Sequence, residues 1–173
     1  RSFHALLNGQ SQEKRHFVVK EYNENAGGSR DPMRAVQSKR YLYIYNPWSN
    51  GERVFATATS STPTYKRFKE LADSHVGFAE RHHLYQHRVV EELYDIKADP
   101  NCLNNLIEDP AHDEALTLHR RRLQTWMRNT GDAMLQIYKD RENVDKREAY
   151  IQMLERASQE RRNKKKKNNQ NNK

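Results

Sequence analysis

The first half of the chain carries short apolar runs of strand length. Phe17–Tyr22 is a β-branched run, and Met33–Val36 and Tyr41–Tyr45 follow with a period of two, separated by the polar turn 37–40. A fourth run, Glu92–Ile96, lies further along the chain. Period-two alternation and β-branched or aromatic residues are typical of strands. The pattern therefore predicts an antiparallel sheet of about four strands.

Three other segments show helical spacing. Ser2–Leu7 has a serine cap and is followed by Gly9, and Pro63–Ala72 has apolar residues three or four apart with proline in its first turn. His112–Asn129 carries a longer apolar stripe, which indicates a helix with one buried side. We expect this helix to pack on one face of the sheet. The stripe is formed by Leu116, His119, Leu123 and Trp126.

The C-terminal part of the chain is strongly charged. Ile137, Val144 and Ile151 recur every seven residues among many charged positions, which indicates an exposed, partly packed helix. Residues 163–173 contain only Asn, Gln and Lys, so they have no apolar group to bury and should be disordered. The expected fold class is α+β. It comprises a packed sheet and helices at 1–132, a charged helical extension at 133–162 and a disordered Lys/Asn tail at 163–173.

The charge of the chain is concentrated in that tail. The 173 residues include 31 Lys and Arg against 23 Asp and Glu, a formal net charge of +8. Residues 159–173 account for +6 of this total, with seven basic residues and Glu160. Such a tail could attract nucleic acid or a polyanionic glycan, but no aromatic residues interleave with it to stack on bases. We therefore favour a solvated tail and regard nucleic acid as a poor candidate partner.

Hydropathy excludes a membrane span. Only 35% of residues are hydrophobic, and no apolar run approaches the roughly 18–20 residues that a spanning helix needs. The first residues lack the apolar region of a signal peptide. Because the chain begins with Arg1, we expect it to be a piece of a longer protein whose export signal could precede it. The single cysteine, Cys102, permits no internal disulfide and leaves the redox compartment open.

Motifs for catalysis or metal binding are absent from the sequence. It contains no G-x-S-x-G, no glycine-rich phosphate loop, no C-x-x-C and no H-E-x-x-H. His83 and His87 lie four residues apart, with His82 beside them, and could share a helix face as metal ligands do. No cysteine or carboxylate completes a recognisable set of ligands, so we favour solvated histidines before a strand. We expect no catalytic residue and no metal site in this chain.

Polar residues flank a loop with two glycines between the first two predicted strands. Glu21, Asn23 and Glu24 precede the loop, and Arg34 follows it. The guanidinium fork of arginine matches sulfate, phosphate or carboxylate oxygens, and the other groups can bond to sugar hydroxyls. Glu21, Asn23 and Arg34 are therefore the candidate substrate-binding residues. The alternative is that Arg34 pairs with Glu21 or Glu24 and only braces the loop.

An aromatic stripe is a second candidate for ligand contact. Tyr41, Tyr43 and Tyr45 alternate along one predicted strand, and Trp48 follows. These rings could stack on sugars or bases. Alternation of this kind is more typical of one half-buried face of a sheet, and we favour that interpretation.

Two parts of the chain resemble the C-terminal part of sulfatases. Pro32–Val36 with Lys39–Asn46 is similar to the family pattern MRAV-x-T-x-R-Y-K-Y-I. Glu92–Pro100, followed by Asn104-Asn105-Leu106 and Asp109-Pro110, is similar to ELYDL-x-x-DP-x-E-x-x-NL. Many relatives carry Glu in the stretch that holds Cys102. Within the family the order of segments is most similar to heparan N-sulfatases. The segments that carry this likeness are Pro32-Met33-Arg34, Ser61–Thr64 and Arg88–Asp95. The end of the predicted helix, with Trp126-Met127 and Thr130-Gly131-Asp132, resembles sulfatases in general.

The resemblance covers about Arg1–Asp132. It implies the fold directly, and the function only by analogy. Asp-Pro and Asn residues turn the chain and cap helices, so the motif is a structural signature. Sulfatases use a formylglycine made from a C/S-x-P-x-R motif and a calcium ion, and the sequence around Cys102 lacks the Pro and Arg of that motif. The resemblance therefore implies that calcium and formylglycine belong to a missing N-terminal catalytic domain, which would be a partner of this chain.

Two functions from different classes remain open. The first is the C-terminal part of a sulfatase that acts on a sulfated carbohydrate, N-sulfoglucosamine of heparan type, in an exported (periplasmic, extracellular or lysosomal) enzyme. On its own this part should be inactive. The second is a basic-tailed module that binds nucleic acid or sulfated glycan through charge.

Overall fold

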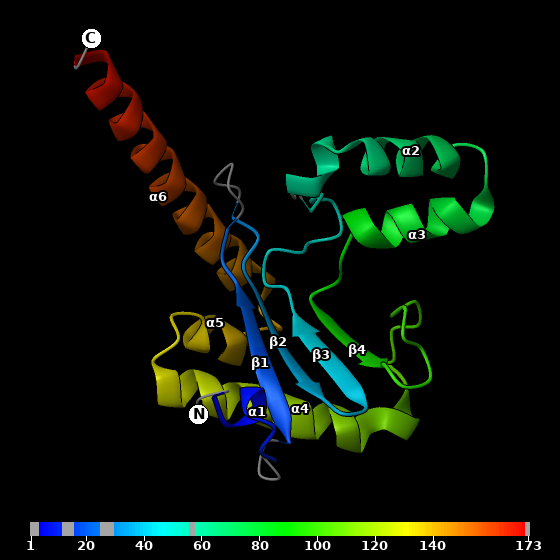
Figure 1. Cartoon of the computed structure of the whole chain (residues 1–173). Helices are drawn as coiled ribbons and strands as arrows, with labels where there is room; N and C mark the ends of the chain where they lie inside the picture. The colour runs from blue at the N-terminus through cyan, green and yellow to red at the C-terminus, as the bar shows by residue number, and fades with distance from the viewer. Residues whose placement is uncertain (1–3, 12–15, 25–29, 56–57, 172–173) are drawn as a thin grey trace.

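The computed structural model describes residues 4–11, 16–24, 30–55 and 58–171. Its centre is a four-stranded antiparallel sheet with the strand order β1-β2-β3-β4 (Figure 1). The predicted α+β class and the four predicted strands are confirmed. β1 and β3 have the predicted bounds, β2 extends two residues further, and β4 begins and ends one residue earlier. The strands are β1 (Phe17–Tyr22), β2 (Met33–Ser38), β3 (Tyr41–Tyr45) and β4 (Glu91–Asp95).

One face of the sheet forms the core. The register aligns Val19, Val36, Tyr43 and Leu93 in a single row across all four strands. Because successive strand residues point to opposite faces, these four side chains share one face. Val36, Tyr43 and Leu93 belong to the same buried cluster as residues of α4 (Asp113–Thr130) and α5 (Leu135–Lys139), and the partly buried Val19 packs against it. The helical members of that cluster are Leu116, Leu123, Met127, Ile137 and Tyr138.

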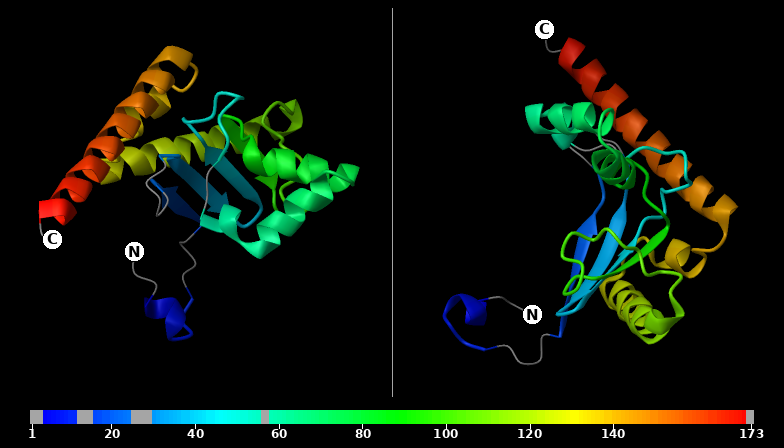
Figure 2. Two further views of the ribbon diagram at one scale, coloured as in Figure 1. Left: turned by 90° about the horizontal axis from the view of Figure 1, so that it is seen from above. Right: turned by 90° about the vertical axis from the view of Figure 1, so that its right-hand side faces the viewer.

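The opposite face of the sheet is mixed, with Lys20 and Gln37 on β1 and β2 and the buried Glu92 and Tyr94 on β4 beside apolar residues. It carries Val18, Ala35, Leu42 and Ile44, each with intermediate exposure. Figure 2 shows α4 and α5 on one side of the sheet only, and among the described residues no long helix lies over the other side. The sheet is therefore covered by helices on one face, while over the other face the described chain places loops at β4 and no long helix.

Helix α4 has clear signals at both ends. It follows a 3₁₀ turn, η2 (Pro110–His112), whose cap Asp109 accepts the Ala111 N–H at 3.0 Å. It ends at Gly131, whose φ of 67° is the left-handed conformation that glycine adopts without strain.

Trp126 packs against the core cluster, as predicted, but only at its margin. Met127 is fully buried, whereas Trp126 is only partly buried at the margin of the cluster. Position 127 and not 126 completes the fully buried stripe with positions 116, 119 and 123.

Two helices form a hairpin beyond the end of the sheet (Figure 1). α2 (Pro63–Ala72) has the predicted bounds, and its N-cap Thr62 accepts the Tyr65 N–H at 3.3 Å. It follows the short 3₁₀ helix η1 (Ala58–Ser61). α3 (Val76–Gln86) was not predicted, because its mixed histidine and apolar positions have little helical periodicity. The hairpin is closed by aromatic pairs, such as Phe68 with Phe78 at a ring distance of 6.1 Å.

The charged extension is two helices and not one. α5 is separated from α6 (Val144–Asn171) by a turn in which the Asn143 N–H donates to the Asp140 carbonyl at 2.8 Å. Ile137 and Ile151 are buried, but Val144 is exposed at the start of α6. Because the chain turns between the two helices, the predicted seven-residue repeat does not continue along one helix face.

Two predictions at the chain ends differ from the structure. α6 continues to Asn171, where we expected disorder from 163, because the segment contains no proline or glycine to end a helix. Residues 172–173 lie outside the described residues. The N-terminal helix is described as α1 (His4–Leu7), and its predicted first residues, Ser2 and Phe3, also lie outside.

His119 is held neutral inside the core. Its Nδ1 donates to the Ala115 carbonyl at 2.7 Å, which leaves Nε2, 3.1 Å from the Ser38 hydroxyl, as an acceptor. Burial lowers the pKa of His119. Below about pH 6.5 the unfolded chain therefore protonates His119 more readily than the folded chain does. The neutral, buried His119 thus favours the folded state above about pH 6.5, and this stabilisation is lost as the pH falls.

We expect the stability of the wild-type chain to fall more steeply with acid than that of His119→Asn. The difference between their unfolding free energies should change by at most about 1.4 kcal/mol per pH unit below pH 6.5. Urea unfolding from pH 7.5 to 5 measures it. The exposed His75→Asn variant is the control and should keep the wild-type slope. Equal slopes for wild type and His119→Asn would show that His119 does not titrate differently on folding.

Candidate functional site

The candidate substrate-binding residues lie together at one end of the β1–β2 pair. Glu21 lies opposite Arg34 in the register, and Asn23 follows β1 directly. Glu21 and Asn23 are exposed, whereas Arg34 is buried. The loop that they flank, 25–29, lies outside the described residues. Glu21 and Asn23 are thus accessible to a ligand, whereas Arg34 is not.

Arg34 binds the protein itself. Its Nε donates to Asp132 Oδ2 at 2.7 Å, and one terminal nitrogen donates to the carbonyls of Tyr22 and Met33 at 3.1 and 2.9 Å. The side chains of Arg34 and Asp132 are 5% and 3% exposed, so water does not screen this pair. Arg34 therefore ties the ends of β1 and β2 to the turn after α4.

The alternative partner of Arg34 considered from the sequence was Glu21 or Glu24. In the structure Glu24 binds Arg30 at 2.9 Å and Arg161 of α6 at 2.7 Å. The long-range partner Asp132 was not predicted, because nothing in the local pattern links two residues 98 positions apart. The only sequence signal was that both residues lie in family-like segments.

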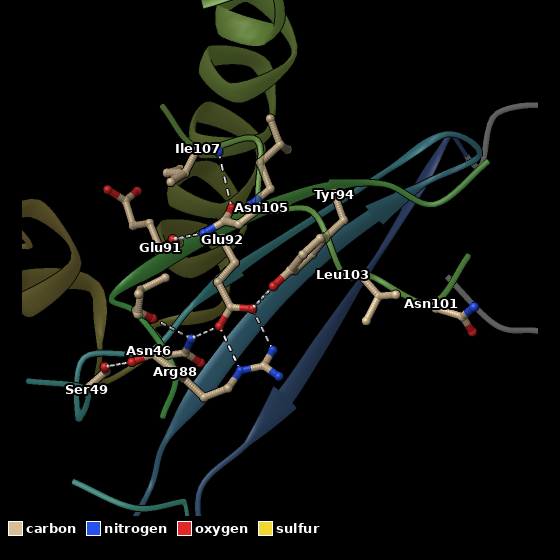
Figure 3. A network of polar contacts seen from close by, with 12 residues as sticks. Asn46, Ser49, Arg88, Glu91, Glu92, Tyr94, Asn101, Leu103, Asn105 and Ile107 are labelled. Atoms are coloured by element: carbon tan, nitrogen blue, oxygen red, sulfur yellow. Dashed lines mark hydrogen bonds and ion pairs between the residues drawn. The ribbon is translucent and has the colours of Figure 1, made fainter. Parts of the chain in front are cut away.

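A second polar cluster surrounds Glu92 on the sheet face opposite α4 and α5 (Figure 3). Arg88 donates to both carboxylate oxygens of Glu92, at 2.8 and 2.6 Å. Asn46 Nδ2 donates to Oε1 at 2.6 Å, and the Tyr94 hydroxyl donates to Oε2 at 2.7 Å. Burial, followed by the negative charge of Glu92, raises the pKa of Tyr94, so the phenol stays protonated and keeps donating. Glu92 is 1% exposed, and four donors occupy its oxygens.

The Glu92 cluster joins three parts of the chain. Asn46 also donates to the Val89 carbonyl at 2.8 Å, and the Ser49 hydroxyl donates to the Arg88 carbonyl. These bonds fasten the turn after β3 to the segment that leads from α3 into β4. Sequence reasoning missed the cluster, although the alternation along β4 places Glu92 and Tyr94 on one face and thus gave a signal.

The Asp and Asn residues of the family-like segment have structural roles. Asp99 Oδ2 accepts the N–H groups of Leu103 and Asn104 at 2.6 and 2.8 Å. Asn105 Oδ1 accepts the N–H groups of Leu93 and Ile107 at 2.9 and 3.2 Å (Figure 3). These side chains shape the loop between β4 and α4, as the motif predicted.

Cys102 lies in the same loop with a left-handed φ of 52°. Burial raises the pKa of its thiol, so it has little thiolate character. The residue shapes a turn and is not an activated nucleophile.

The tyrosine stripe faces the core. Tyr43 and Tyr45 are fully buried, and their hydroxyls bond to Glu91 Oε1 at 2.5 Å and to the Ile137 carbonyl at 3.0 Å. Trp48 is also buried and stacks on Phe55. The interpretation of the stripe as a sheet face is confirmed, and these rings do not reach a sugar.

The histidine cluster occupies α3 and its end. His83 and His87 lie with ring centroids 4.8 Å apart, and His82 Nε2 is 3.1 Å from the Tyr65 hydroxyl. Within the described ranges no three His, Cys, Asp or Glu residues gather closely enough to hold a metal ion. No helix in those ranges is long and apolar enough to span a membrane.

Sequence comparison gives one curated relative of this chain. An ulvan-active sulfatase from Formosa agariphila is 28% identical over 127 residues, which cover 72% of this chain and 21% of the relative. No family model matches the chain. The chain thus spans about a fifth of the length of the relative. The predicted resemblance to the sulfatase family is confirmed by this relative.

Two solved structures that match this chain are described as sulfatases. One comes from Bacteroides thetaiotaomicron VPI-5482, and another is a 2-O GAG sulfatase. Each is 23% identical with a TM-score of 0.46, and each match covers 81% of this chain and 21% of the other. A TM-score of 0.46 is too low to assign the fold, which rests on the strand order and register of this chain.

We expect loss of the Arg34 guanidinium to destabilise the fold. Arg34→Met keeps the length of the side chain but leaves Asp132 buried without its partner, which should lower the free energy of unfolding by about 3–5 kcal/mol. Urea denaturation measures this loss.

The control for this prediction is Arg40→Met. Arg40 binds Asp95 at 2.8 Å with the same kind of contact but is largely exposed, so its loss should have a much smaller effect. The double variant R34M/D132N should recover part of the stability lost in Arg34→Met. An unchanged melting temperature for Arg34→Met would contradict the structural role.

Proposed function

We propose that this chain is the C-terminal subdomain of a sulfatase that removes sulfate from a sulfated sugar, N-sulfoglucosamine of heparan type, and that it has no turnover on its own. The observation that carries the proposal is the similarity to an ulvan-active sulfatase over 127 residues, a fifth of the length of that protein. In this proposal the parent enzyme is exported, to the periplasm, the cell exterior or a lysosome.

The polar groups of the chain support the proposal that it has no activity on its own. The carboxylate of Glu92 accepts hydrogen bonds from Arg88, Asn46 and Tyr94. Its oxygens are therefore not available to exchange a proton with a ligand. Calcium and formylglycine belong to the catalytic domain in this proposal, because the chain has no C/S-x-P-x-R motif. There the formylglycine residue would supply the group that accepts the sulfate, and a calcium ion would supply a positive charge beside the sulfate oxygens.

The sheet face opposite α4 and α5 supports the presence of a covering domain. Val18, Ala35, Leu42 and Ile44 form an apolar surface that lacks a helix layer. A sheet normally buries apolar faces against another layer. In this proposal the N-terminal catalytic domain is that layer.

The exposed residues Glu21 and Asn23 would contact the sugar at the rim of the catalytic pocket. Both lie at the end of β1 with free side chains, and their oxygen and amide groups suit sugar hydroxyls. Arg34 then acts as a positioning residue, since it donates to the carbonyl of Tyr22, the residue between Glu21 and Asn23.

The test compares this chain with the longer protein in which it follows a catalytic domain. The isolated chain should not hydrolyse N-sulfoglucosamine or an aryl sulfate with calcium present, and the longer protein should hydrolyse N-sulfoglucosamine. Turnover by the isolated chain that a point substitution within it abolishes would contradict the proposal. Preference of the longer protein for an O-sulfated sugar would overturn the substrate but keep the family.

We expect Glu21→Gln and Asn23→Ala in the longer protein to reduce kcat/KM at least tenfold without lowering the melting temperature. A tenfold loss corresponds to about 1.4 kcal/mol of transition-state stabilisation. Glu114→Gln is the matched control, because Glu114 is exposed in the first turn of α4. Wild-type kcat/KM in both variants would show that Glu21 and Asn23 do not contact the substrate.

A further inference from the structure

The second half of α6 is a strongly basic helix. From Arg156 to Lys167 the sequence contains seven Lys and Arg residues and only Glu160 as an acid, a net charge of +6. The structure continues the helix through this segment to Asn171. A helix rises about 1.5 Å per residue, so the last 14 residues of α6 extend roughly 20 Å. We call residues 156–171 the basic arm.

The first half of α6 anchors the arm to the body of the protein. Ile151 is fully buried, and Glu148 accepts hydrogen bonds from Arg53 at 3.1 Å and from Asn50 at 3.2 Å. Beyond Ser158, which is also buried, the helix projects away from the sheet (Figures 1 and 2). The arm is therefore a protrusion with a fixed base.

The base of the arm lies beside the candidate rim. Arg161 binds Glu24 at 2.7 Å, and Glu24 follows Asn23 at the end of β1. Arg156 and Lys164 are exposed and have no ion pair within the described parts of the chain. A linear ligand that ends at Glu21 and Asn23 would thus meet unneutralised positive charge as it leaves the rim.

We propose that the basic arm binds the anionic chain of a sulfated polysaccharide beyond the terminal sugar. This inference rests on the proposed function for the position of the terminal sugar. Closely spaced Lys and Arg attract polyanions and release their counterions. The arm has no aromatic residue, which disfavours single-stranded nucleic acid, since that ligand is held by base stacking. A sulfated polymer has regular charge and needs no stacking platform.

The experiment measures binding and not turnover, so it is independent of the proposed activity. The full chain is titrated with heparin, with desulfated heparin and with duplex DNA at several salt concentrations. The test variant is K164Q/K165Q/K166Q/K167Q, because glutamine has nearly the helix propensity of lysine. The control, K39Q/K66Q/K69Q/K97Q, removes four exposed lysines from the body and has the same net charge.

The arm variant should lose at least tenfold in affinity for heparin at low salt, and the control variant should lose little. The slope of log Kd against log salt should become shallower by roughly 3 in the arm variant only, as expected for four lost ionic contacts. Desulfated heparin should bind at least tenfold more weakly than heparin.

Three outcomes would overturn the inference. Equal losses in both variants would mean that net charge and not the arm attracts heparin. Equal binding of heparin and desulfated heparin would remove sulfate as the ligand group. Tighter binding of duplex DNA than of heparin at the same salt would assign the arm to nucleic acid. Loss of sulfatase activity in the longer protein with intact heparin binding would instead contradict only the proposed function.

Discussion

Val36, Tyr43 and Leu93 are buried with Leu123 and Met127 of α4, with Val19 packed against them, and the rest of the structure is arranged around this contact. Burial of these side chains fixes the register of four strands, because a shift of one residue would turn every strand to the wrong face. With the register fixed, Glu21 faces Arg34 and Glu92 falls on the face opposite α4 and α5. The positions of the polar clusters are consequences of the packed face.

The polar residues at the centre of the chain mainly hold its parts together. Arg34 joins β1 and β2 to the turn after α4, and Glu92 joins β3, β4 and the segment after α3. Buried charges are tolerated only when donors surround them, and both groups meet that condition. Groups with this many partners are poor candidates for chemistry.

Local patterns in the sequence predicted most of the fold. Phe17–Tyr22, Tyr41–Tyr45 and Pro63–Ala72 have the bounds that alternation, helical spacing and a proline in the first turn indicated. α3 was missed because its apolar residues have almost no periodicity, and the break before α6 was missed because a seven-residue repeat continued across it. A helix without apolar periodicity and a turn inside a continuing repeat cannot be recognised from local sequence patterns.

The candidate site was harder to predict, because its key contacts join distant residues. Glu21 and Asn23 are exposed as a rim requires, but the partner of Arg34 lies 98 positions away. Neither composition nor spacing carries that information. The resemblance to sulfatases located the right segments without giving the contact between them.

The central claim of the proposed function is that a catalytic domain covers the face of the sheet that carries Val18, Ala35, Leu42 and Ile44. Of the four methionines, Met33 lies on that face with intermediate exposure, Met153 is exposed on α6, and Met127 and Met134 are buried. Peroxide oxidises accessible methionine, so each of the four acts as a local probe of exposure.

The most direct test is peptide mass spectrometry of methionine oxidation in the isolated chain and in the longer protein. In the isolated chain Met153 should oxidise fastest, Met33 more slowly, and Met127 and Met134 slowest. In the longer protein Met33 should fall to the rate of Met127, while Met153 keeps its rate. Equal oxidation of Met33 in both proteins would contradict the account.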